Sequence, residues 1–150
     1  MKPLIVLLFS FTISLLIIKI TNRTYDFKLS GRIAMSMMLV FTAIGHFAFT
    51  KGMSMMIPKI IPYKETFVHL TGIFEIILAI GLLVPRVKHI SGWALIIFLI
   101  LMLPANIVAA LNKVDYQNAT LDGNGLTYLW FRIPLQLLFI IWIYMSAVRI

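Results

Sequence analysis

Residues 67–84, FVHLTGIFEIILAIGLLV, form a mostly apolar stretch whose only charged side chain is Glu75. A helix of this length spans about 27 Å at 1.5 Å per residue, which is close to the roughly 30 Å hydrocarbon thickness of a bilayer. The stretch is followed by Pro85, Arg86 and Lys88, where the hydrophobic pattern stops. This segment therefore predicts a transmembrane helix, and the fold class follows from it.

The composition of the whole chain is also that of a membrane protein. Of its 150 residues, 61% are hydrophobic and 12% are charged, whereas soluble domains have about 45–50% and about 25%. Four further stretches have the length and hydrophobicity of a span, at residues 3–20, 31–50, 91–111 and 128–148. We therefore predict one integral membrane domain over residues 1–150, an all-α polytopic helix bundle with no separate soluble domain.

The first span begins like a secretory signal, with Lys2 ahead of an apolar run over residues 3–20. No pattern of small residues suited to cleavage follows it. We interpret it as a retained signal anchor, which adds an N-terminal helix to the four later spans.

Orientation is predicted from the distribution of basic residues, because cytoplasmic loops carry an excess of Lys and Arg. The chain has a net charge of +8, which we assign to anchoring in lipid rather than to nucleic-acid binding. The more basic face carries Lys19, Arg23, Lys28, Arg32, Arg86, Lys88 and Arg149. The N-terminus is therefore expected outside and the C-terminus in the cytoplasm.

Polar side chains inside the spans are the main functional signal. His46, Glu75, Asn106 and Gln136 lie about 8–12 Å inside the ends of their helices at 1.5 Å per residue, with Arg132 shallower. All five fall in the same half of the bilayer, the outer half in the predicted orientation. Because polar groups are costly in lipid and tend to mark function, we predict that these five residues line one ligand-binding pocket.

Glu75 is the only acidic residue inside any span, and Arg132 is the only cation at comparable depth. A buried charge costs about 2.5–3.5 kcal/mol on insertion scales unless a partner or a proton compensates it. We therefore expect Glu75 and Arg132 to lie in direct or water-bridged contact. The structural alternative is a buried ion pair that fixes helix register without any substrate.

Residues 51–66 are too apolar for water and too interrupted, by Pro58 and Pro62, to cross the bilayer. We predict that they lie at the interface and that the part between Lys59 and Lys64 covers the polar pocket. Residues 112–127, by contrast, are predicted to form a polar loop.

The chain has no cysteine, which excludes disulfides, thiolate nucleophiles and iron–sulfur clusters. Met-Ser-Met-Met occurs at residues 35–38 and 53–56. Methionine side chains can bind copper(I), but we favour apolar packing as the interpretation of these two stretches. A haem held by His46 and His69 is a further alternative. We predict no metal site.

Five segments, taken in order, resemble the DoxX-like family of small bacterial integral membrane proteins. They are GRIAMSMMLVFTAIGHF at 31–47, MMIPKIIP at 55–62, HLTGIFEIILAIGLLVP at 69–85, LPANIVAAL at 103–111 and YLWFRIPLQ at 128–136. The resemblance implies a four-helix membrane core in the bacterial inner membrane. It also implies an association with redox complexes and quinone reduction, without assigning a catalytic residue.

These observations favour a redox-associated membrane subunit whose pocket binds a quinone or another small lipophilic ligand. Quinone is then the only cofactor expected, and a redox partner protein would supply the electrons because the chain carries no redox centre. Two alternatives remain open: a small permease or proton-coupled carrier, and a non-catalytic assembly subunit. Membrane lipids are the other expected partners, and nucleic acid is not one.

Overall fold

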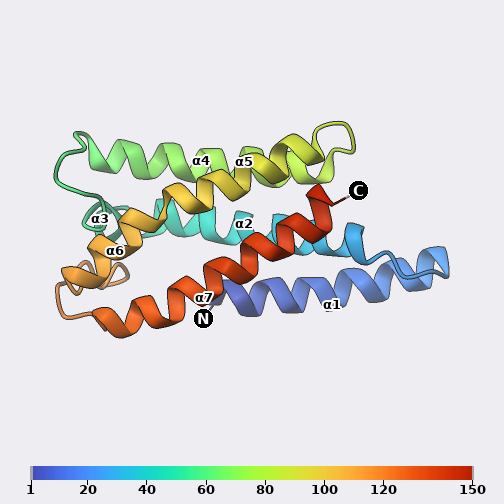
Figure 1. The fold of residues 1–150 in the computed structure, drawn as a ribbon, viewed down its shortest axis with the longest axis horizontal. Helices are drawn as coiled ribbons and strands as arrows, with labels where there is room; N and C mark the ends of the chain where they lie inside the picture. Colours follow the sequence, from blue (N-terminus) through green and yellow to red (C-terminus); the bar gives the residue numbers. More distant parts are fainter. Residues whose placement is uncertain (1, 150) are drawn as a thin grey trace.

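The computed structural model describes residues 2–149 and is all-α, with no strand among the described residues apart from one isolated bridge between Asp115 and Thr120 (Figure 1). Its helices occupy the following ranges: α1 Lys2–Asn22, α2 Phe27–Ala48, α3 Thr50–Ser54, α4 Lys64–Leu83, α5 Lys88–Leu101, α6 Leu103–Leu111 and α7 Leu126–Ile143. The last continues as a π-helical segment, η1 Tyr144–Val148. The predicted helix bundle is therefore confirmed.

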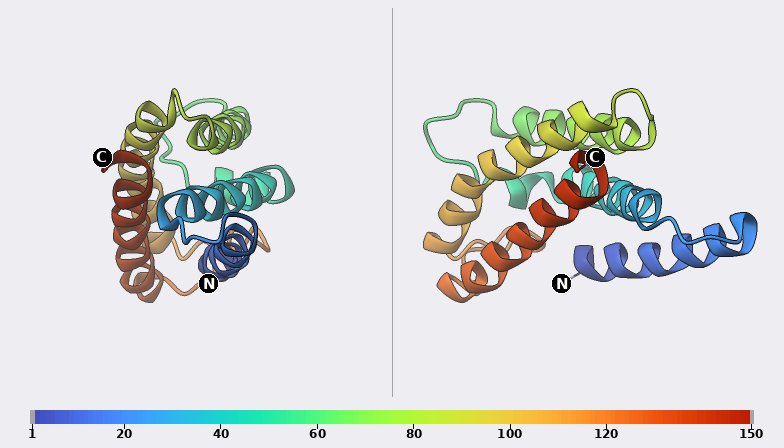
Figure 2. Two further views of the ribbon diagram at one scale, coloured as in Figure 1. Left: turned by 90° about the vertical axis from the view of Figure 1, so that its right-hand side faces the viewer. Right: turned by 45° about the vertical axis from the view of Figure 1, so that its right-hand side comes forward.

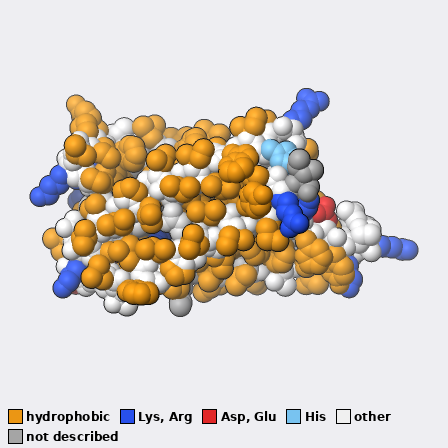
Figure 3. All heavy atoms as spheres, in the orientation of Figure 1, with side chains coloured by type: hydrophobic (Ala, Val, Ile, Leu, Met, Phe, Trp, Pro, Cys, Tyr) orange, Lys and Arg blue, Asp and Glu red, His pale blue; other side chains and the backbone are white. Residues whose placement is uncertain are grey.

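Five helical segments are long and apolar enough to cross a membrane: Lys2–Asn22, Phe27–Ala48, Lys64–Leu83, Lys88–Leu111 and Leu126–Val148. Ile77, Ile97 and Leu137, from three different helices, are each more than half exposed. The surface between the two ends of the molecule is largely hydrophobic, and Lys and Arg side chains gather toward the ends (Figure 3). The chain is a multi-pass membrane protein.

The helices form two layers (Figure 2). One layer contains α1, α2 and α4, and the other contains α5, α6 and α7. α1 packs mainly on α2, where the Ser14 hydroxyl donates to the Ser30 carbonyl over 3.3 Å. It is displaced along the long axis and extends beyond the other helices at its C-terminal end (Figure 1).

Local signals explain where the helices begin and end. The Asp26 carboxylate accepts a hydrogen bond from the Leu29 amide over 2.8 Å, so it caps the first turn of α2. α4 ends at Leu83, shortly before Pro85, as proline cannot continue a helix.

The span expected as one helix over 91–111 is interrupted. It starts earlier, at Lys88, and divides into α5 and α6 at Met102, because Pro104 has no amide hydrogen to donate to the preceding turn. The Met102 amide instead donates to the carbonyls of Phe98 and Leu99, over 3.0 and 3.2 Å. The break redirects the last part of the span.

The apolar core fills the half of the bundle nearest the α4–α5 turn. Met35, Leu82, Leu95 and Ile143 are almost completely buried there, together with Leu7 from α1. Small residues let the helices approach, as is common in membrane bundles. The opposite half of the bundle is not filled in the same way, and the polar residues lie there.

Candidate functional site

One cavity of about 670 Å³ occupies the half of the bundle that contains the C-terminal end of α2 and the N-terminal ends of α4 and α7. The structure brings all five predicted site residues to its wall: His46, Glu75, Asn106, Arg132 and Gln136. They come from α2, α4, α6 and α7, so both layers contribute. Most of the remaining wall is apolar, including Met38, Leu39 and Phe139.

Glu75, on α4, is held in place by residues of α2. Its side chain is buried, with the residue only 7% exposed, and the Thr42 hydroxyl donates to its Oε2 atom over 2.9 Å. The Nδ1 atom of His46 lies 3.5 Å from the same oxygen. A β-carbon placed at Gly72 would lie 2.9 Å from the β-carbon of His46, so a glycine is required for α4 to approach α2 at this level. This close approach brings the carboxyl group to its two partners.

The His46 ring is oriented by its own helix. Its Nδ1 atom lies 3.0 Å from the Thr42 carbonyl oxygen. Because a carbonyl can only accept, this contact is a hydrogen bond only when Nδ1 carries a proton. The same nitrogen lies 3.5 Å from Glu75 Oε2, so Thr42, His46 and Glu75 form one polar cluster.

Of the direct or water-bridged contact expected between Arg132 and Glu75, the direct form is not made. Within residues 2–149, no guanidinium nitrogen lies within the 4.0 Å of a Glu75 oxygen that defines an ion pair. Instead, Arg132 Nε donates to Asn106 Oδ1 over 3.4 Å, and the guanidinium lies 5.5 Å from the centroid of the Tyr128 ring. The reason is the layer arrangement: α4 packs on α2, whereas α7 lies in the other layer, so the two charged groups face one cavity from different walls.

Gln136 lines the cavity and also makes a hydrogen bond to the backbone of another helix. Its amide nitrogen donates to the Leu99 carbonyl, at the interruption between α5 and α6. Backbone groups freed by a proline within a membrane helix are commonly satisfied by a neighbouring helix in this way. One amide hydrogen of Gln136 is therefore used to stabilise the break, which Pro104 causes.

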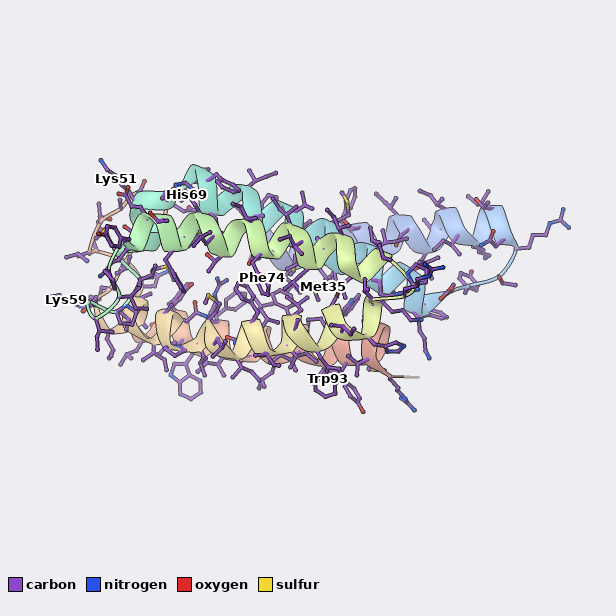
Figure 4. The ribbon with its side chains drawn as sticks, turned by 90° about the horizontal axis from the view of Figure 1, so that it is seen from above. Met35, Lys51, Lys59, His69, Phe74 and Trp93 are labelled. Carbon is purple, nitrogen blue, oxygen red and sulfur yellow. The ribbon has the colours of Figure 1, made fainter. Side chains whose placement is uncertain are left out.

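The segment between α3 and α4 lines one end of the cavity, through Met56, Ile57 and Pro58 ahead of the predicted cover and Ile61 within it. Met56 and Ile57 are buried and line the cavity, whereas Ile60 is 89% exposed. The Lys64 ammonium donates to the Ile57 carbonyl over 2.8 Å and fixes the segment against the start of α4. Lys59 lies at this end of the molecule (Figure 4).

The α6–α7 loop supplies two further wall residues, Tyr116 and Gln117. It is tightly turned, because the Asp115 carboxylate accepts hydrogen bonds from the Gln117 amide over 2.9 Å and from the Asn118 side chain over 2.8 Å. These bonds, the one from Asn118 first, hold the pKa of Asp115 below its usual range. A β-carbon at Gly52 would lie 1.8 Å from the Tyr116 carbonyl oxygen, so α3 packs directly on this loop.

Several residues that line the cavity were not among the predicted site residues. Thr42 lies one turn before His46 on the same helix face, and this spacing is the signal that identifies it. Lys2, which precedes the first span, also lines the cavity because α1 is displaced along the bundle. Tyr116 and Gln117 lie in a loop and carry no comparable signal.

Of the two histidines considered for haem binding, only His46 lines the cavity. Among residues 2–149, no group of three His, Asp or Glu side chains is placed to hold one metal ion. His69 stacks on the Phe47 ring at 5.4 Å between centroids, and it does not line the cavity.

Comparison with known proteins gives one match. The family model described as "Domain of unknown function (DUF8561)" matches residues 35–147, about three quarters of the chain. The matched range includes all five predicted site residues. No curated protein and no solved structure matches the chain.

Proposed function

Since the chain belongs to the family described as a domain of unknown function (DUF8561), we propose its function from its own cavity: it binds a small lipophilic molecule of the quinone type within the membrane. The observation that carries this proposal is the meeting of His46, Glu75, Asn106, Arg132 and Gln136 on the wall of one cavity of about 670 Å³. An otherwise apolar pocket with a few converging polar groups is the usual form of a small-molecule site.

Each polar residue has a role in this proposal. The Asn106, Gln136 and His46 side chains carry the hydrogen-bonding groups that a quinone ring needs at its carbonyl oxygens. Reduction of a quinone to a quinol takes up two electrons and two protons. One proton would come from the cluster of Thr42, His46 and Glu75, at Glu75 or His46, and the second from water, and Arg132 would compensate negative charge on the ring.

The electrons would come from a redox partner protein or a substrate, because no side chain of this sequence is a redox centre. The resemblance to DoxX-like proteins supports this redox-associated role. The same resemblance supports a bacterial inner-membrane location, and the charge distribution supports an orientation that puts the cavity in the outer half. An N-terminus outside and a C-terminus in the cytoplasm follow from the same argument.

The proposal is tested by ligand binding to the purified protein. The protein is isolated in a mild detergent, its bound lipids are extracted and identified by mass spectrometry, and a benzoquinone with a decyl chain is titrated into the delipidated protein. We expect saturable binding, and Asn106→Leu to weaken it about tenfold through loss of a hydrogen-bonding group. Thr12→Val, on the exposed face of α1, is the control and should bind normally. Absence of saturable binding to the unmodified protein would contradict the proposal.

A second candidate, a proton-coupled carrier, is favoured by one observation, the 3.5 Å separation of His46 Nδ1 and Glu75 Oε2 on the cavity wall. Such a pair suits a proton relay. In proteoliposomes that enclose a pH-sensitive dye, a carrier would acidify the interior along an imposed gradient and Glu75→Gln would abolish the signal. A ligand-binding subunit would give no proton flux.

A further inference from the structure

A second hollow lies beside the cavity, between α4 and the α5–α6 segment. It has a volume of about 660 Å³, and it is lined by residues of α4 between Phe67 and Ile77 and by Phe98, Leu101 and Met102. Thr71 is its only polar lining residue, and no charged group faces it. We call it the lateral groove.

The lateral groove adjoins the cavity across a shared wall. Phe67, Thr71, Phe98, Leu101 and Met102 line both. Thr71 lies one helical turn before Glu75 on α4, so the shared wall leads directly to the polar group. A ligand that passed between these shared side chains would occupy both hollows.

The outer rim of the lateral groove faces the lipid. Leu101 is 64% exposed at this rim, whereas Phe98 is 7% exposed at its base. Figure 4 shows Phe74 pointing from α4 toward the α5–α6 layer. Its ring lies 5.4 Å from that of Phe98, between centroids, so this aromatic pair bridges the two helices at the groove. The opening is lateral, toward the acyl chains, rather than toward water.

The chemistry of the two hollows differs. The cavity offers a carboxyl group, an imidazole, a guanidinium and two amides, which suit a polar ring or head group. The lateral groove offers only aliphatic and aromatic side chains and one hydroxyl, which suit a hydrocarbon chain. Resting on the proposed function, we propose that the ligand is a single-chain amphipathic lipid whose polar head lies in the cavity and whose tail lies in the lateral groove, and that it reaches the cavity directly from the bilayer.

Tail affinity alone is a poor test, because lipid acyl chains are as apolar as the lining of the groove. A better test is to obstruct the lateral groove with a larger side chain. Ile73→Trp places a large side chain in the lateral groove, whereas Ile80→Trp changes another lipid-facing isoleucine of α4 that does not line it. The two isoleucines are 47% and 60% exposed, so they are a matched pair.

Two probes are compared on each variant reconstituted in nanodiscs: a tail-less benzoquinone and the same ring with a decyl chain. Ile73→Trp should weaken the decyl probe about tenfold and leave the tail-less probe within about twofold, and Ile80→Trp should affect neither. Equal binding of the decyl probe to both variants would overturn the groove assignment while leaving the proposed function intact. Failure of both probes to bind the unmodified protein would instead overturn the proposed function and this inference with it.

A cross-linking measurement on the unmodified protein tests the proposal even if the tryptophan variants misfold. A quinone with a photoreactive group at the end of its decyl chain is cross-linked, and the labelled peptides are identified by mass spectrometry. Labelling within residues 67–77 or 98–102 is expected. Labelling confined to the α3–α4 segment would place the tail at the other end of the cavity and contradict the proposal.

Discussion

The Thr42 hydroxyl donates a 2.9 Å hydrogen bond to Glu75 Oε2 and so joins α2 to α4 at the wall of the cavity. This bond and the 3.5 Å approach of His46 Nδ1 to the same oxygen, rather than an ion pair with Arg132, are the direct contacts of the buried carboxyl group. The Glu75 carboxyl group is therefore held within the layer that contains α1, α2 and α4. The guanidinium approaches from the other layer and remains available to a ligand.

Removal of that hydroxyl is expected to destabilise the bundle. Thr42→Val keeps the shape of the side chain but leaves a buried carboxyl oxygen without its donor, which costs about 1–3 kcal/mol. Thermal unfolding in detergent measures the change. Thr12→Val is the control, because the Thr12 hydroxyl bonds only to its own helix at an exposed position. Equal melting temperatures for the two variants would contradict the assigned role.

Glu75 should couple more strongly to Thr42 than to Arg132. Residues in contact have interaction energies of about 0.5–3 kcal/mol in double-mutant cycles. We expect that range for Thr42→Val with Glu75→Gln, and a smaller value for Glu75→Gln with Arg132→Gln. If Arg132→Gln instead restored most of the stability lost in Glu75→Gln, the two residues would form a structural pair and the ligand-binding role would lose its support.

Gly72 and Gly45 should respond in opposite directions to alanine. A β-carbon at Gly72 meets His46 at 2.9 Å, whereas one at Gly45 meets only the end of Met53, at 3.7 Å. Gly72→Ala should therefore separate α4 from α2, lower stability by about 1–3 kcal/mol and weaken quinone binding. Gly45→Ala should raise stability by about 0.5–1 kcal/mol, because alanine favours the helix. Thermal unfolding of the two variants tests this difference, which equal effects would refute.

The orientation is tested by adding single cysteines to this naturally cysteine-free chain. Asn118→Cys, in the exposed α6–α7 loop, should react with a membrane-impermeant maleimide added outside intact cells. Arg86→Cys, in the α4–α5 turn, should react only after the membrane is opened. The reverse pattern would place the cavity in the cytoplasmic half. Labelling of Glu75→Cys by a bulky reagent from either side would contradict its burial.

Much of the fold follows from the sequence because membrane spans are set by length and hydrophobicity. Depth along each span is equally simple, since a helix rises 1.5 Å per residue. This is why the level of His46, Glu75 and Asn106 could be predicted before their contacts were known. The existence of a cavity at that level depends on packing and could not be derived in the same way.

The partners within the site were harder to predict, because depth does not say which helices are neighbours. Glu75 and Arg132 have comparable depths, but α4 and α7 lie in different layers, so of the predicted direct or water-bridged contact the direct form is absent. The interruption at Met102 was missed for a related reason. Pro104 is visible in the sequence, yet whether a membrane helix bends or breaks at proline depends on what satisfies the freed carbonyls.

That dependence yields a final prediction, in which Gln136 and Pro104 act as one unit. The Gln136 amide donates to the Leu99 carbonyl at the break, so Gln136→Leu should cost about 0.5–1.5 kcal/mol in the native chain. Pro104→Ala restores an amide hydrogen for the Ile100 carbonyl and allows α5 and α6 to join, so that the Leu103 amide can reach the Leu99 carbonyl and the Gln136 donor becomes less necessary. Gln136→Leu should therefore cost less in the Pro104→Ala background, as measured by thermal unfolding. An unchanged cost would mean that Gln136 acts on the cavity rather than on the break, and the loss would then appear in quinone affinity.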